Sequence, residues 1–137
     1  MIIDAHTHIF PERIRRNREK YFADEPAFKK LYQSPKSRLI GAREMLASMD
    51  DSQVDKAVVF GFPWKAPLLF KQHNDYISEV VKRYPQRFIG LGCFDPFSDG
   101  VAEETRRCLQ KAGLSGNGEL AFYQTGIENT SLPRLEP

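Results

Sequence analysis

The sequence has few cysteines. Its 137 residues include only Cys93 and Cys108, which lie far apart and do not form a Cys-x-x-Cys motif. This excludes a disulfide framework, so we expect two free, buried thiols in a reducing compartment.

Long apolar runs are also missing. No apolar run approaches the length needed to cross a bilayer. The opening residues do not resemble a secretory leader, because Asp4 and two histidines interrupt the apolar start. We therefore expect a soluble, cytoplasmic protein without a membrane partner.

The charge is nearly balanced, with 20 lysines and arginines against 18 acidic residues and a net charge of +2. The densest basic stretch, residues 13–20, is accompanied by no second basic cluster and no stacking aromatic residues. A solvated helix face is the preferred interpretation, and we expect no nucleic-acid partner.

What is present is an alternation of apolar strands and amphipathic helices in a chain of one-domain size. The expected strands are Ile2–Ala5, Val54–Gly61, Arg87–Phe94 and Leu114–Leu120. The expected helices are Gly41–Ser52, Asn74–Tyr84 with Asn74 as N-cap, and Val101–Ala112. Continuous apolar strands that alternate with helices predict a parallel α/β sheet, which places functional loops at the carboxyl ends of its strands.

The segment Glu12–Gln33 is polar and helix-rich, and it predicts a pair of short helices inserted after the first strand as a lid. Loops are expected at Phe62–Gln72 and Asp95–Gly100. In the first loop, Phe62 and Trp64 could line a substrate pocket near the metal, but packing under the loop is the preferred interpretation, and Asp95 is expected to form a turn.

Asp4, His6 and His8 are spaced two residues apart at the start of the chain. Side chains with this spacing project from one face of a strand, so the two imidazoles could chelate one divalent cation. Asp4 could orient a histidine or only cap backbone amides, and both interpretations remain open.

Three stretches resemble the amidohydrolase superfamily. Ile3-Asp4-Ala5-His6-Thr7-His8 is similar to the metal-binding first strand of that superfamily. Residues 74–77, 84–90 and 95–96 resemble its amidohydrolase-related branch, which contains hydrolases and non-oxidative decarboxylases. Gly118-Glu119-Leu120-Ala121-Phe122-Tyr123 resembles the fourth strand of TatD-type hydrolases, where a glutamate serves the metal. The resemblance implies the first half of a TIM (β/α)8 barrel.

The same resemblance implies His6, His8 and Glu119 as metal ligands and a divalent metal, with zinc as the first expectation. An exposed loop carboxylate is the alternative for Glu119. The family's remaining histidines and its aspartate base have no counterpart here, so no catalytic residue is assigned. His73 is expected to be a polar loop residue and not a ligand.

We expect residues 1–137 to be a single domain, the N-terminal half of a metal-dependent hydrolase barrel. The chain would be a fragment, or else a half-barrel that associates through its first and fourth strands, whose edges are unpaired. The favoured function is a hydrolase that cleaves a C–N, ester or lactone bond of a small molecule through metal-activated water. One alternative is a metal-dependent non-oxidative decarboxylase of an aromatic or unsaturated acid, and another is a non-catalytic assembly module.

Overall fold

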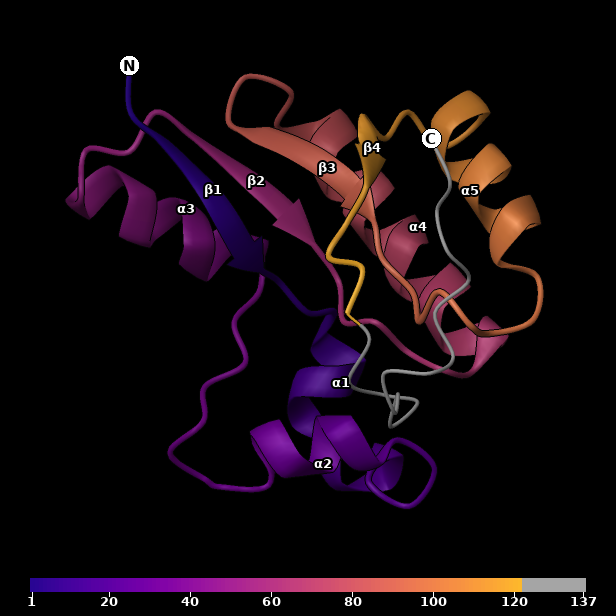
Figure 1. The fold of residues 1–137 in the computed structure, drawn as a ribbon. Coiled ribbons are helices and arrows are strands. Elements are labelled where there is room, and N and C mark those ends of the chain that lie inside the picture. Colours follow the sequence, from indigo (N-terminus) through magenta and orange to yellow (C-terminus); the bar gives the residue numbers. More distant parts are fainter. Residues whose placement is uncertain (122–137) are drawn as a thin grey trace.

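A four-stranded parallel sheet organises the chain in a computed structural model that describes residues 1–121 (Figure 1). The strands are β1 (Ile3–His8), β2 (Lys56–Phe60), β3 (Phe88–Gly92) and β4 (Gly116–Asn117). The helices are α1 (Glu12–Arg16), the 3₁₀ turn η1 (Arg18–Tyr21), α2 (Pro26–Tyr32), α3 (Ala42–Asp51), α4 (Pro67–Arg83) and α5 (Val101–Gln110). The strand order β1-β2-β3-β4, with every pair parallel, confirms the predicted fold class.

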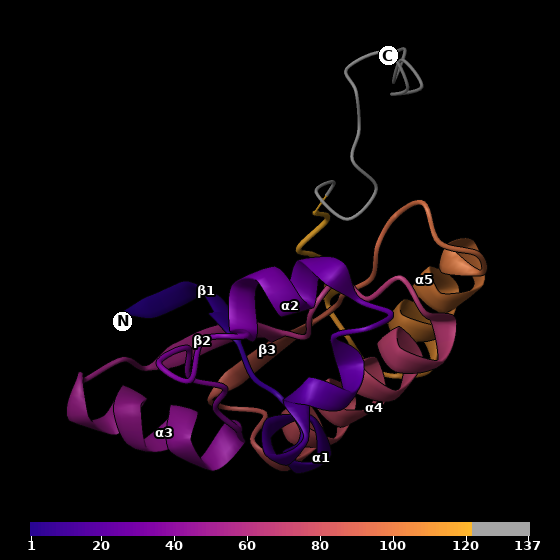
Figure 2. The same cartoon turned by 90° about the horizontal axis from the view of Figure 1, so that it is seen from below.

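The helices form two groups around this sheet. Helices α3, α4 and α5 cover one face, whereas α1, η1 and α2 lie beyond the carboxyl ends of β1 and β2 (Figures 1 and 2). Among the described residues, no helix is long and apolar enough to span a membrane. The inserted helices therefore stand at the edge of the sheet where parallel α/β proteins place their chemistry.

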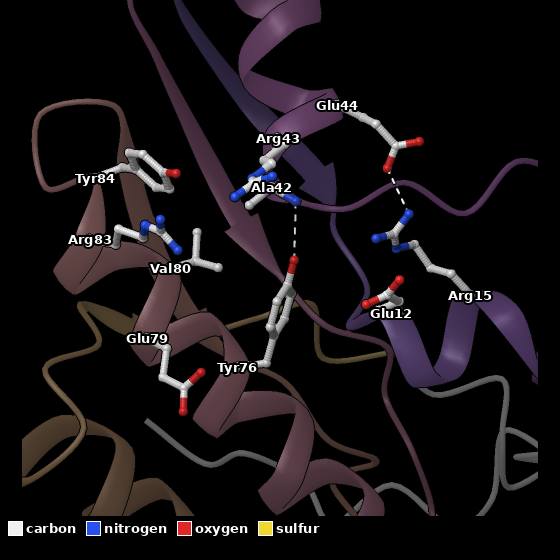
Figure 3. A pocket seen from close by; sticks show the side chains of 10 residues that line it. All are labelled: Glu12, Arg15, Ala42, Arg43, Glu44, Tyr76, Glu79, Val80, Arg83 and Tyr84. Atoms are coloured by element: carbon white, nitrogen blue, oxygen red, sulfur yellow. Dashed lines mark hydrogen bonds and ion pairs between the residues drawn. The ribbon is translucent and has the colours of Figure 1, made fainter.

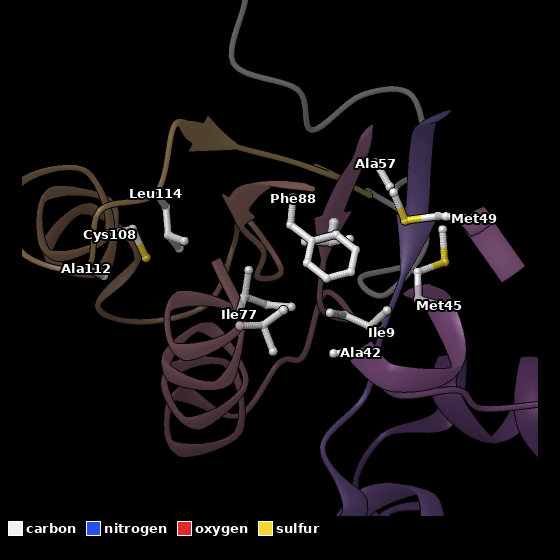
Figure 4. Close-up of a cluster of buried hydrophobic side chains, with 12 residues drawn as sticks. Ile9, Ala42, Met45, Met49, Ala57, Ile77, Phe88, Cys108, Ala112 and Leu114 are labelled. Atoms are coloured by element: carbon white, nitrogen blue, oxygen red, sulfur yellow. The ribbon is translucent and has the colours of Figure 1, made fainter. Parts of the chain in front are cut away.

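The main core lies between the sheet and the three covering helices (Figure 4). Ala57, Val59 and Phe88 point from the strands into this core and meet Ile77 of α4 and Met49 of α3. Val58 of β2 and Ile89 and Leu91 of β3 point to the other face and are only half-buried, whereas Phe60 at the end of β2 is buried. Because strand side chains alternate, this face is the one that would line the interior of a barrel.

A buried polar network joins α4, α5 and β3. The Asn74 side chain has no exposed surface; its amide donates to Glu104 Oε1 at 2.8 Å and its oxygen accepts the Cys93 N–H at 2.9 Å. Arg107 donates two further hydrogen bonds to the Glu104 carboxylate and one to Asp75. Every member is paired, so the network fixes the end of β3 against both helices.

Two predictions about α4 were wrong. The helix begins at Pro67, so Asn74 lies inside it and is not its N-cap, and His73 is a fully buried helical residue instead of a loop residue. Proline is tolerated in a first helical turn because its missing N–H has no partner there. The Glu25 carboxylate, from just before α2, accepts the N–H groups of Lys65 and Ala66 at this helix start.

The strand boundaries also differ from expectation. β1 extends to His8, so both histidines belong to the strand and not to the loop behind it. β4 has only two residues, although Leu114–Leu120 was expected. Gly116 provides no side chain to pack, and β4 pairs with β3 through Leu91 with Gly116 and Gly92 with Asn117. The insertion at Glu12–Gln33 contains two short helices and a 3₁₀ turn, and its role as a lid stays a prediction.

We predict that Asn74→Ala lowers the free energy of unfolding by about 2–4 kcal/mol, because it leaves the Cys93 N–H and the buried Glu104 carboxylate with unmet hydrogen bonds. Asp75→Ala is the matched control on the same helix; Asp75 pairs with Arg107 but its side chain is 49% exposed, so the loss should stay below about 1 kcal/mol. Urea unfolding measures both values. Equal losses would contradict the importance of the buried network.

The same network makes part of the stability depend on pH. Burial by itself raises the pKa of Glu104, but the hydrogen bonds from Arg107 and Asn74 outweigh it and leave the pKa below the usual 4.5. The stability from ionised Glu104 is therefore present above pH 4.5 and is lost as the pH falls through the lower folded value. We expect the stability gap between the wild type and Glu104→Gln to be largest near neutral pH and to shrink below about pH 4. Glu103→Gln, at an exposed neighbouring position, should show no such change in repeated urea titrations.

Candidate metal centre

The end of β1 brings two imidazoles together. The Nε2 atoms of His6 and His8 are 3.3 Å apart, and a register irregularity between Asp4 and Thr7 lies just before this end of the strand. Two nitrogens that each bind one tetrahedral metal at about 2.1 Å are about 3.4 Å apart. The observed separation therefore fits a shared cation.

His8 has a defined tautomer. Its Nδ1 lies 2.8 Å from the Gly61 carbonyl oxygen. A carbonyl can only accept, so Nδ1 carries the proton and Nε2 presents a lone pair towards His6. Burial lowers the pKa of His8 and outweighs the raising effects of the Gly61 hydrogen bond and the Glu119 charge, with His6 adding to the lowering. The neutral imidazole that a metal requires is thus the favoured form.

Glu119 reaches the two imidazoles from the chain just after β4, at the opposite edge of the sheet from β1. One of its carboxylate oxygens lies 3.4 Å from His8 Nε2 and 3.8 Å from His6 Nε2. A ligand atom from each of the three residues lies within 4.8 Å of the others. Two imidazole nitrogens and a carboxylate oxygen approach this closely when they share a proton or a cation. The donor set therefore fits a divalent metal.

Phe60 restrains both imidazoles and was not predicted. It is 3% exposed, and its ring centroid lies 5.0 Å from that of His6 and 4.7 Å from that of His8, with edge-to-face geometry. Phe60 is the last residue of β2 and pairs with His8 across the strands. Only this register could have revealed the contact, and register is not visible in the sequence.

The other residues considered for the site cap backbone groups, pack in the interior or form a turn. Asp4 Oδ1 accepts the His6 N–H at 3.2 Å, which agrees with backbone capping. Phe62 and Trp64 are buried in an aromatic cluster, and Asp95 Oδ1 accepts the Phe97 N–H in a turn. Cys93 and Cys108 are free and buried, as expected. In the TatD-like stretch, Phe122 and Tyr123 lie outside the described residues.

A separate groove of about 500 Å³ lies on the outside of the molecule, between α1, α3 and α4 (Figure 3). Its charged lining consists of three arginines and three glutamates, Arg15, Arg43, Arg83, Glu12, Glu44 and Glu79. Arg15 pairs with Glu44, and the Tyr76 hydroxyl accepts the Ala42 N–H. This balanced lining favours neither an anion nor a cation, and the groove is not part of the metal centre.

Comparison with known proteins identifies the family of this chain. The sequence model of the Amidohydrolase family matches residues 3–128. The match covers most of the chain and includes His6, His8 and Glu119. The chain belongs to the amidohydrolase family.

Individual relatives give a more specific comparison than the family does. The chain is 30% identical to a 2-amino-3-carboxymuconate-6-semialdehyde decarboxylase of Dictyostelium discoideum, in an alignment that covers 83% of this chain and 38% of that protein. Among solved structures, it resembles 5-carboxyvanillate decarboxylase from Novosphingobium aromaticivorans, complexed with manganese and 4-hydroxy-3-methoxy-5-nitrobenzoic acid. That match has a TM-score of 0.66, 22% identity, and covers 85% of this chain and 40% of the other. It also resembles 2,6-dihydroxybenzoate decarboxylase complexed with 2,6-dihydroxybenzoate, with a TM-score of 0.57, 20% identity, and coverage of 85% and 38%.

These comparisons correct one expectation. A hydrolase was favoured from the sequence, but the curated relative and both solved structures are decarboxylases, so that preference is wrong. The chain spans about two fifths of the length of the relatives it matches. The metal in the first solved structure is manganese, which supports a divalent metal, and the expected zinc is not shown.

We predict that His8→Ala weakens Mn²⁺ binding by more than about tenfold, since even the residues behind a ligand are worth 10–100-fold. Isothermal titration of the purified protein with MnCl₂ measures the affinity. His6→Ala and Glu119→Gln should weaken it in the same direction, whereas Glu103→Ala, an exposed carboxylate on α5, should leave it unchanged. If both histidine variants bind Mn²⁺ as tightly as the wild type, the prediction of a metal centre at these residues is wrong.

Proposed function

We propose that the chain carries the metal-binding corner of a divalent-metal-dependent, non-oxidative decarboxylase that acts on a small aromatic or unsaturated acid. One observation carries the proposal: two imidazole nitrogens and a carboxylate oxygen converge at the carboxyl ends of the strands, in a chain whose curated relative is a decarboxylase. His6, His8 and Glu119 would hold the metal, with manganese as the preferred ion because a solved structural neighbour is complexed with it.

In such a reaction the bond between a carbon and its carboxyl group breaks. The electron pair stays on that carbon, which takes up a proton, and carbon dioxide leaves. When bound, a divalent cation supplies a Lewis acid that holds a substrate oxygen and withdraws electron density. The chain itself contributes the orientation of its ligands: Gly61 fixes the His8 tautomer, and Phe60 restricts both rings.

The inserted helices contribute a phenol near this corner. Burial raises the pKa of Tyr32 on α2, and the nearby Glu119 charge raises it further. Tyr32 therefore remains a protonated donor at neutral pH, and its ring packs against Phe10 and Phe28. Phe10 and Phe28 are buried and support the Tyr32 ring, so the partly exposed Tyr32 phenol is the group of α2 that could donate to a polar substituent of the acid.

The test is an assay of carbon dioxide release. The full-length polypeptide is loaded with Mn²⁺. It is then incubated with 2-amino-3-carboxymuconate semialdehyde, 5-carboxyvanillate or 2,6-dihydroxybenzoate. We expect release from at least one acid, dependence on added metal, and a loss of at least about 100-fold in His8→Ala, the scale of several kcal/mol of lost metal stabilisation.

Two outcomes would contradict the proposal. One is release that is equal in the wild type and in His8→Ala. The other is a metal-loaded protein that binds these acids but releases no carbon dioxide from any of them. Self-association of a metal-free, inactive chain would instead support an assembly module.

A further inference from the structure

His73 is a buried imidazole to which the proposed reaction assigns no role. It lies on α4, has no exposed surface, and uses both ring nitrogens. Nδ1 is 2.9 Å from the Trp64 indole nitrogen, and Nε2 is 2.8 Å from the Ile9 carbonyl oxygen. An indole N–H only donates and a carbonyl only accepts, so His73 is the neutral tautomer with its proton on Nε2. Burial lowers the pKa of His73 to about 4, which keeps it neutral.

The backbone segments that touch His73 are those that orient His8. Ile9 follows His8 directly, so the hydrogen bond from His73 Nε2 fixes the chain just after the ligand. Gly61, whose carbonyl accepts the His8 Nδ1–H, packs closely against the His73 ring. A Cβ atom at position 61 would lie 2.7 Å from His73 Cγ, which is closer than carbon atoms approach. His73 thus bonds to the chain just after β1 and packs against the chain just after β2, the two segments that orient His8.

The other nitrogen connects this support to the inserted helices. Trp64 is fully buried, and its ring centroid lies 4.7 Å from that of Phe28 on α2 and 5.8 Å from that of Tyr21 on η1. The hydrogen bond from Trp64 therefore ties the aromatic cluster under the insertion to the residue that supports the metal ligand. An apolar side chain at position 73 would leave the indole N–H and the Ile9 carbonyl without these partners.

We propose that His73 is a positioning residue for the metal centre, which keeps His8 Nε2 directed at His6 and Glu119 by holding the Ile9 carbonyl and the Gly61 backbone. The inference rests on the proposed metal binding and deepens it. Both His73 nitrogens already have partners, Trp64 and Ile9, so neither is available as a metal ligand. His73 acts through backbone, as residues behind metal ligands commonly do.

The test compares Mn²⁺ affinity in variants of α4. His73→Phe keeps a ring but loses both hydrogen bonds, and we expect an affinity loss of about 10–100-fold. His73→Gln retains a donor and an acceptor, so it should recover part of that loss. Ser78→Ala is the matched control: Ser78 is a buried residue of the same helix that donates to the Ala112 carbonyl, away from the metal centre. It should lower stability to urea but leave the affinity within about twofold, since additive sites do not couple.

Gly61→Ala provides a second route if His73→Phe does not fold. It removes no hydrogen-bonding group but pushes against the His73 ring, so we expect it to weaken Mn²⁺ binding in the same way. The proposal is overturned if His73→Phe, or Gly61→Ala in its place, binds Mn²⁺ as tightly as the wild type. It is also overturned if Ser78→Ala loses as much affinity at a similar loss of stability.

A metal-free measurement separates this inference from the proposed function. Nitrogen-15 NMR of the imidazoles reports which ring nitrogen of His8 carries the proton. The wild type should show the Nδ1–H tautomer, and His73→Phe should show a mixture of tautomers. If the wild type binds no Mn²⁺ but this difference is seen, the metal proposal fails and the positioning role stands. If the tautomer of His8 is the same in both proteins, the positioning role fails.

Discussion

The hydrogen bond between His8 Nδ1 and the Gly61 carbonyl is the contact on which the candidate centre depends. It joins the ends of two neighbouring parallel strands and decides which nitrogen of His8 is free. Without it, the 3.3 Å approach of the two Nε2 atoms would have no defined lone pair to offer a cation. The contact exists only because β1 and β2 pair in parallel and end at the same edge of the sheet.

Successive layers of buried side chains support that contact. Phe60 stands beside the imidazoles, His73 lies beneath Gly61, and Trp64 links His73 to the inserted helices. Farther along the sheet, Asn74 and Glu104 fix the end of β3, and the Cys93 thiol lies 3.5 Å from the Glu119 carbonyl oxygen. All of these polar groups are paired, as buried polar groups must be if they are to define one arrangement. The two networks hold the opposite sides of the centre, one behind His8 and the other behind Glu119.

The errors made from the sequence have clear physical origins. The segment Phe62–Gln72 was expected to be a loop, but α4 begins within it at Pro67, and the partner of this helix start is Glu25, about forty positions earlier in the chain. Asn74 suggested a helix cap because its side chain often bonds locally, whereas here it bonds to Glu104 and Cys93 on other elements. The preference for a hydrolase followed from a family that contains both reactions, and the residues of this chain that resemble the family do not distinguish them. In each case the deciding partner lay outside the local pattern.

By itself, the sequence determined the parallel α/β architecture, since continuous apolar strands alternating with amphipathic helices bury their surfaces in few other ways. It also determined that His6 and His8 share one face, because the period of a strand is two. The family resemblance implied Glu119 beside them, but only the tertiary structure brings its carboxylate within 3.8 Å of both imidazoles and holds His8 as the Nδ1–H tautomer. It also decided that His73 supports the site instead of facing solvent. These features depend on strand register and on contacts between residues tens of positions apart, and such distances are set when the sheet and its helices pack.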